Sequence, residues 1–182
     1  MASQLPTVPR VTFTILEPIS LFAGWIAPLM SPEYFVSNQL PSSALPHPSL
    51  AEPSAYPLRP HETILAMQVS NCYLLLGLLG IFILNTTTEL KVVRAYLWAL
   101  WLGDIGHVGV TMWCMGWEAV RDVGNWNAVV WGNIAATVVL FSIRTAYFAG
   151  LFGERNPRSA RAARGGSASR GRGKGRGKGK TN

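Results

Sequence analysis

The sequence predicts an all-α polytopic membrane protein: a four-helix transmembrane bundle followed by a disordered C-terminal tail. Of its 182 residues, 49% are hydrophobic and only 14% are charged, which is unusual for a soluble domain of this size. Four apolar stretches are long enough to cross a bilayer, which takes about 20 helical residues. None of the four shows the polar stripe, recurring every three or four residues, that a helix of a soluble all-α protein presents to water.

The first two predicted spans are residues 11–30 and 63–85, and residues 1–10 form a short N-terminal segment before them. Glu17 and Pro18 interrupt the first span. Because proline lacks a backbone donor, we expect this helix to be kinked or to begin anew near Ser20. The second span is the most uniformly apolar of the four.

The other two predicted spans are residues 95–116 and 128–152. The third span contains Asp104 and His107, and the fourth contains Arg144. Ionisable residues at membrane depth almost always face the interior of a helical bundle, so their presence is compatible with both helices spanning the bilayer.

Three connections join the spans. Residues 31–62 contain seven prolines, which predict an irregular luminal loop. Residues 86–94 predict a tight turn. Residues 117–127 combine two tryptophans with charged side chains, which is typical of a segment at headgroup level.

Orientation follows from the positive charges near the ends of the spans. Residues 1–152 carry six Lys or Arg against eight Asp or Glu, whereas the tail, residues 153–182, carries ten Lys or Arg against one Glu. An even number of spans places both termini on one side, and the more positive side of a membrane protein is cytosolic. Both termini are therefore predicted to be cytosolic. The residues counted on that side, besides the tail, are Arg10, Lys91 and Arg94, against Arg59 and Arg121 opposite.

Two short motifs bear on location. Asn85 begins the sequon Asn-Thr-Thr, which this orientation places at the cytosolic end of the second span, so we expect it to be unglycosylated. Lys178 and Lys180 resemble a dilysine retrieval signal of endoplasmic-reticulum membrane proteins. The predicted location is the endoplasmic reticulum or another endomembrane.

Three charges are predicted to share one layer of the membrane. Counting about 1.5 Å per residue from the cytosolic ends places Glu17, Asp104 and Arg144 at depths of roughly 10–14 Å. An unpaired charge there costs about 2.5–3.5 kcal/mol on insertion scales. We therefore predict an intramembrane ion pair of Arg144 with Glu17, Asp104 or both, the alternative being that Arg144 extends toward the cytosolic headgroups.

A second polar layer is predicted deeper in the bilayer. His107 and Asn71 lie at roughly 19 and 21 Å by the same count, and Asn133 and Gln68 lie nearer the luminal face. These side chains either line a proton-binding or ligand-binding cavity or hydrogen-bond to one another and fix helix packing. The candidate ligand-binding residues are Asp104, His107, Glu17 and Asn71.

Small residues in three spans predict close helix approach. They are Gly77 and Gly80, then Gly103, Gly106 and Gly109, then Gly132, Ala135 and Ala136.

The sequence contains no hydrolase, P-loop or dinucleotide-binding motif, and its three histidines are too dispersed for a metal site. No cofactor or metal is expected. The tail is rich in Gly, Ser, Arg and Lys, so it is predicted to be disordered and to bind anionic lipid. RNA binding by the tail is disfavoured, because it has no aromatic residue for base stacking.

Four segments together resemble a family of fungal integral membrane proteins that carry a domain of unknown function. They are ILEPISLFAGWIAPLM, the Pro-rich loop, LWLGDIGHVG and VVWGNIAATVVLFSIRTAYFAGLF, and the resemblance covers residues 11–152. It implies a four-span protein but no reaction. A more distant likeness, to the emopamil-binding and sigma-2-type bundles, rests on span number and intramembrane acids alone.

Three functional hypotheses follow. The first is a small bundle that binds a hydrophobic ligand or a partner protein. The second is an enzyme acting on a lipid or sterol, with Asp104 and His107 as acid and base beside Glu17. The third is a proton-coupled carrier that works as an oligomer. The sequence leaves open whether the protein is an enzyme.

Overall fold

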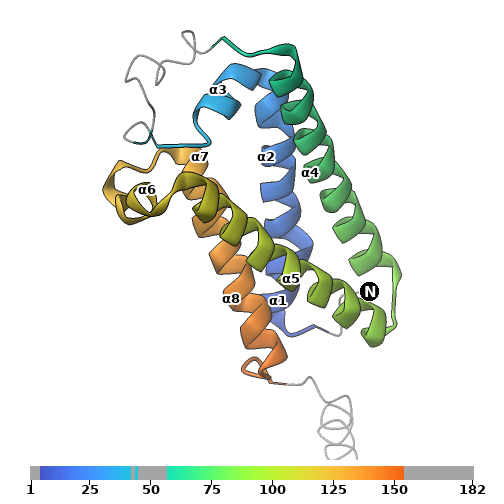
Figure 1. The fold of residues 1–182 in the computed structure, drawn as a ribbon. Coiled ribbons are helices and arrows are strands. Elements are labelled where there is room, and N and C mark those ends of the chain that lie inside the picture. Colours follow the sequence, from blue (N-terminus) through green and yellow to red (C-terminus); the bar gives the residue numbers. More distant parts are fainter. Residues whose placement is uncertain (1–4, 42–43, 45–56, 154–182) are drawn as a thin grey trace, which may run out of the picture. The chain divides into compact units, whose positions relative to one another are not determined.

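The computed structural model of the chain describes residues 5–41, 44 and 57–153, and every regular element among them is a helix (Figure 1). By length and composition, three helical segments within this part of the chain can cross a membrane: Thr7–Met30, Pro60–Thr86 and Ala128–Phe148. These segments indicate a multi-pass protein that sits in a lipid bilayer. The predictions for the tail beyond Gly153 concern residues outside the described part.

The first segment consists of α1 (Thr7–Val11), the π-helical turn η2 (Thr12–Leu16) and α2 (Glu17–Met30), which follow one another directly. Of the two alternatives for this span, a new helix does not begin at Ser20; the irregularity beside Glu17 and Pro18 is the π-helical turn η2. At the end of η2, the Glu17 backbone N–H donates to the carbonyl of Thr12, five residues earlier. The next residue, Pro18, has no backbone N–H to donate. The helix also starts earlier than predicted, because a proline such as Pro9 is tolerated in a first turn.

A short helix, α3 (Pro32–Ser37), follows α2 within the segment expected to be irregular. The Ser31 hydroxyl accepts a hydrogen bond from the Tyr34 backbone N–H at 3.2 Å, and Pro32 occupies the first helical position. Both features favour a helix start, so proline here begins a helix. The expectation of irregular backbone is therefore wrong for residues 32–37, and residues 42–43 and 45–56 lie outside the described part.

The next two helices are α4 (Pro60–Thr86) and α5 (Leu90–Met115), which residues 87–89 connect. At the start of α4, the Glu62 side chain accepts a hydrogen bond from the Arg59 backbone N–H at 2.8 Å. With 26 residues, α5 is about 39 Å long. It is less apolar than the three segments named above and is not among them.

Gly116 ends α5 with a φ of 80°, a conformation that glycine adopts without strain. The segment expected at headgroup level contains α6 (Trp117–Arg121) and a 3-10 turn, η6 (Val123–Asn125). The last helical segment then consists of α7 (Ala128–Trp131), the π-helical turn η7 (Gly132–Ala136) and α8 (Thr137–Phe148).

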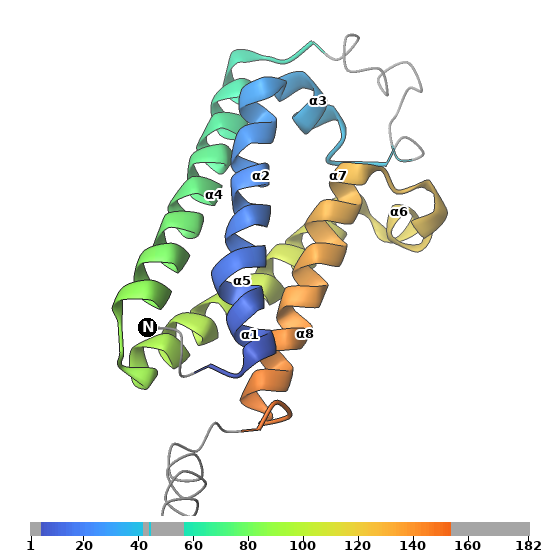
Figure 2. The ribbon, with the colours of Figure 1, turned by 180° about the vertical axis from the view of Figure 1, so that it is seen from behind.

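The long helices pack as two pairs, α2 with α4 and α5 with α8 (Figures 1 and 2). In the first pair, Gly24 lies under the ring of Tyr73, and the Ser70 hydroxyl donates to the Trp25 carbonyl at 2.6 Å. In the second pair, the Trp101 indole N–H donates to the Thr145 hydroxyl at 2.8 Å.

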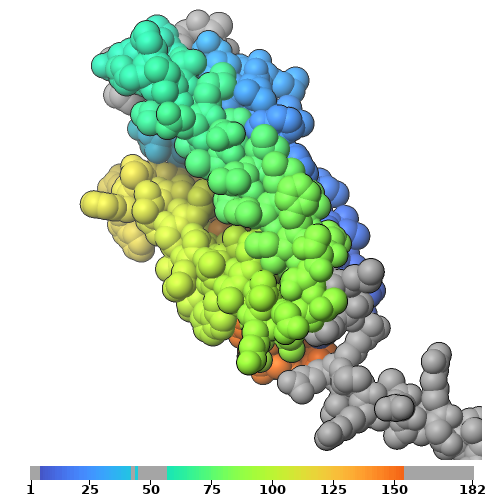
Figure 3. Space-filling model, turned by 90° about the vertical axis from the view of Figure 1, so that its right-hand side faces the viewer, coloured from blue at the N-terminus to red at the C-terminus, as the bar shows by residue number. Residues whose placement is uncertain are grey.

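In contrast, α4 and α5 diverge from the connection that joins them (Figure 1). Both helices are exposed on the face of the molecule that Figure 3 shows. Only some of the glycines predicted to allow close helix approach lie near another helix. Gly77 lies against Leu21 of α2, and Gly80 lies near Tyr96 of α5. No other side chain comes within 4 Å of a Cβ added at Gly103, Gly106, Gly109 or Gly132, so these glycines do not mediate close approach between the described helices.

Candidate functional site

A buried ion-pair triad joins three helical segments. The Arg144 guanidinium on α8 donates one hydrogen bond to Glu17 of α2 and another to Asp104 of α5. The Arg144 side chain is 0% exposed, and the Glu17 and Asp104 side chains are 7% and 11% exposed. Arg144 therefore points into the interior and does not extend toward headgroups.

Apolar side chains enclose the triad on the side of the N-terminus. The Phe13 ring of η2 lies 5.2 Å from the Arg144 guanidinium carbon, at a distance typical of a cation–π contact. Phe13 belongs to a buried cluster that also includes Leu84 of α4 and Leu97 of α5. This packing keeps the three charges in a low-dielectric environment, where each depends on the others for stabilisation.

Two buried atoms of the triad have no hydrogen-bond partner among the described residues. They are the second carboxylate oxygen of Glu17, Oε2, and the Arg144 Nε. The pairing of the triad is therefore incomplete: Arg144 donates one hydrogen bond to each carboxylate, and one buried carboxylate oxygen, Glu17 Oε2, receives none.

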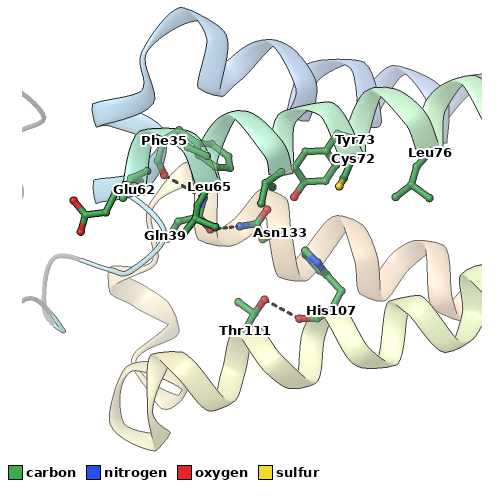
Figure 4. A pocket seen from close by; sticks show the side chains of 13 residues that line it. Phe35, Gln39, Glu62, Leu65, Cys72, Tyr73, Leu76, His107, Thr111 and Asn133 are labelled. Atoms are coloured by element: carbon green, nitrogen blue, oxygen red, sulfur yellow. Dashed lines mark hydrogen bonds between the residues drawn. The ribbon is translucent and has the colours of Figure 1, made fainter. Parts of the chain in front are cut away.

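A pocket of about 530 Å³ lies between α4 and α5 and extends to α3 (Figure 4). This volume is within the range of small-molecule sites, roughly 300–1,000 Å³. Most of the lining is apolar and comes from α3 and α4: Phe35, Val36, Leu65, Ala66, Val69 and Leu76.

Polar groups gather on one wall of this pocket. The Asn133 amide donates to the Gln39 side-chain oxygen at 2.9 Å, and both residues line the pocket. His107 and Thr111 project from α5 onto the same wall, and the Thr111 hydroxyl donates to the His107 carbonyl at 2.7 Å (Figure 4). Asn133 lies in η7, and π-helical turns of this kind occur frequently at functional sites.

The structure divides the sequence-predicted residues between these two places. Glu17, Asp104 and Arg144 form the triad, and His107 lines the pocket. Asp104 is not among the pocket-lining residues, so the proposed acid and base face different environments.

The remaining predicted polar residues lie elsewhere. Asn71 and Gln68 are exposed on α4 and do not line the pocket, so of the four residues in the predicted deeper polar layer only His107 and Asn133 line it. Sequence reasoning missed Gln39, Thr111 and Tyr73, which line the pocket as well. Gln39 lies in the segment expected to be irregular, where no periodicity marked it, whereas the i, i+4 spacing of His107 and Thr111 could have identified Thr111.

Comparison with known families identifies one match. A domain of unknown function, DUF7704, matches residues 2–154, so the chain belongs to this family. No curated protein and no solved structure matches the chain.

Proposed function

We propose that this DUF7704 protein is a four-span endomembrane protein that binds a hydrophobic ligand with an uncharged polar head. The observation that carries the proposal is the pocket between α4 and α5, which combines a mainly apolar lining with a group of neutral polar side chains on one wall. Binding sites for small amphipathic molecules have this composition: mainly apolar lining with a few polar groups that fix orientation.

The chemistry of the polar wall favours an uncharged head group. His107, Asn133, Gln39 and Thr111 offer neutral hydrogen-bond donors and acceptors. Neither lysine nor arginine is among the described lining residues, and Glu62 lies at the α3 end of the pocket. A phosphate head would therefore meet a carboxylate without a counter-charge, whereas a hydroxyl or amide head would find partners.

The divergence of α4 and α5 supports entry of the ligand from the bilayer. Helix α4 packs mainly against α2, and α5 packs mainly against α8. The pocket lies between α4 and α5, where few contacts join the two helices. The separation of Asp104 from His107 favours binding over acid and base catalysis by this pair.

The proposal of a fourth span rests on α5. Its length of about 39 Å exceeds the roughly 30 Å of a bilayer core. It packs along α8 and places Asp104 against Arg144, which lies within the α8 span. An even number of spans, with positive charges gathered beside the termini, supports cytosolic termini and contact of the basic tail with anionic lipid.

Glycosylation mapping distinguishes four spans from three. Ser49→Asn combined with Ala51→Thr creates a sequon in the loop between the first two spans, and we expect the protein to gain one glycan when expressed in a eukaryotic host. Ser167→Asn creates a sequon with Ser169 in the tail, and we expect no glycan there. If α5 did not cross, the tail would be luminal and the Ser167→Asn protein would be glycosylated.

Ligand binding can be tested by filling the pocket. Val69→Trp places a large ring among the lining residues, and we expect the purified full chain to lose a copurifying neutral lipid that mass spectrometry detects in the wild type. Val139→Trp is the matched control, because Val139 is exposed on α8 and does not line the pocket. The same lipid content in wild type and both variants would contradict a binding site here.

The polar wall can be tested separately at His107. We expect His107→Leu to weaken retention of that lipid about tenfold, since one hydrogen bond contributes about 1 kcal/mol or somewhat more. His61→Leu serves as the control, because His61 is exposed in the first turn of α4. Equal lipid retention by both variants would remove His107 from the site.

A further inference from the structure

The triad carries an imbalance of charge that its hydrogen bonds do not remove. Two carboxylates, Glu17 and Asp104, face a single guanidinium, Arg144. With all three groups ionised, the cluster has a net charge of −1 inside the part of the protein that spans the membrane. An uncompensated charge in such an environment is strongly disfavoured.

The groups around the triad cannot supply the missing positive charge. Phe13 of η2 lies beside the Arg144 guanidinium, and the buried cluster that Phe13 joins, with Leu84 of α4 among its members, is apolar. Among the described residues, the phenols of Tyr96 on α5 and Tyr147 on α8 pack against the same apolar cluster. Phenols are neutral at physiological pH, so they do not change the net charge around the triad. His107, one turn along α5 from Asp104, lines the pocket and forms no ion pair with the triad.

We propose that the Glu17–Asp104–Arg144 triad is a proton-binding site that holds one proton at neutral pH, carried by the Oε2 atom of Glu17. Glu17 is the more buried of the two carboxylates. Its Oε1 accepts the hydrogen bond from Arg144, while its Oε2 is buried without a donor. Taking one proton from water brings the cluster from −1 to zero, and Asp104 stays ionised against Arg144. This inference is independent of the ligand proposed for the pocket.

The charge count makes a prediction that burial alone does not. If the proton serves to neutralise the cluster, removal of either carboxylate leaves one acid and one guanidinium, and no proton is then needed. If burial alone protonated Glu17, the proton would persist after Asp104 is neutralised. The two single variants therefore separate the explanations.

Infrared spectroscopy of the full chain in lipid nanodiscs provides the test. We expect the wild type at neutral pH to show a carboxylic-acid carbonyl band that shifts in deuterated water and disappears on alkaline titration. Both Glu17→Gln and Asp104→Asn should lack the band, and Glu33→Gln, at an exposed position on α3, should retain it. The absence of the band in the wild type, or its persistence in Glu17→Gln or Asp104→Asn, would overturn the proposal. If a variant fails to fold, the wild-type spectrum still shows whether the protein holds a carboxylic-acid proton at neutral pH.

Discussion

Replacement of Arg144 by methionine is expected to destabilise the protein by about 3–5 kcal/mol, because it leaves two buried carboxylates without their shared partner. Methionine approximates the length and apolar stem of arginine, so the change removes charge more than volume. Thermal unfolding of the purified full chain and its abundance in membranes would both report the loss.

Two further variants control this experiment. Arg121→Met removes an exposed arginine that lies over Trp117, and its effect should be within about 0.5 kcal/mol. Combining Arg144→Met with Glu17→Gln and Asp104→Asn replaces the triad by neutral groups, which should recover most of the lost stability. An Arg144→Met protein as stable as the wild type would mean that the carboxylates do not depend on the guanidinium.

Gly24→Val is expected to destabilise the contact between α2 and α4 by about 1–3 kcal/mol. A Cβ at Gly24 would lie 3.2 Å from ring atoms of Tyr73, closer than ordinary contact, and the branches of valine would force the ring or the helix to move. The readout is the thermal unfolding midpoint in one detergent.

Gly106→Val is the matched substitution, because no other side chain lies within 4 Å of a Cβ added at Gly106. Its midpoint should stay close to that of the wild type. Equal losses in the two variants would indicate that glycine has a general backbone role in these helices and that the contact with Tyr73 is not tight.

The sequence located the long helices well because uniform apolarity is a strong local signal. It placed the first helix four residues too late and the end of the last helix four residues too far, at Phe152 where α8 ends at Phe148. Helix ends depend on capping residues. Pro6 before α1 and Gly150 after α8 are weak sequence signals of a helix end when the neighbouring residues form a continuous apolar run. The sequence does not predict α3, because a high density of proline disfavours helix, although Pro32 occupies the first helical position, where proline favours one.

The sequence predicts the partners of the charged residues better than those of the neutral polar residues. Depth counting placed Glu17, Asp104 and Arg144 at one level, and they lie together in the structure because charges in a bilayer have few alternatives to pairing. Depth alone does not determine which face of a helix a residue occupies. Asn71 was therefore grouped with His107, although it lies on the exposed face of α4.

The π-helical turn η2 determines which direction the Glu17 side chain takes. A residue in an α-helix turns about 100° from its predecessor, and a π turn contains about one residue more than an α turn. The helix after η2 is therefore rotated by about 100° relative to an uninterrupted α-helix starting at Thr7. A family member with the same number of residues but an uninterrupted α-helix over Thr12–Leu16 would keep the Glu-Pro pair in its sequence, yet direct the carboxylate about 100° away from the arginine. A member that lacks one residue there would direct it toward the arginine only if this turn were α-helical. Presence of the acid is therefore not enough to identify the triad in a relative; the number of residues in the preceding turn and its α- or π-helical form matter together.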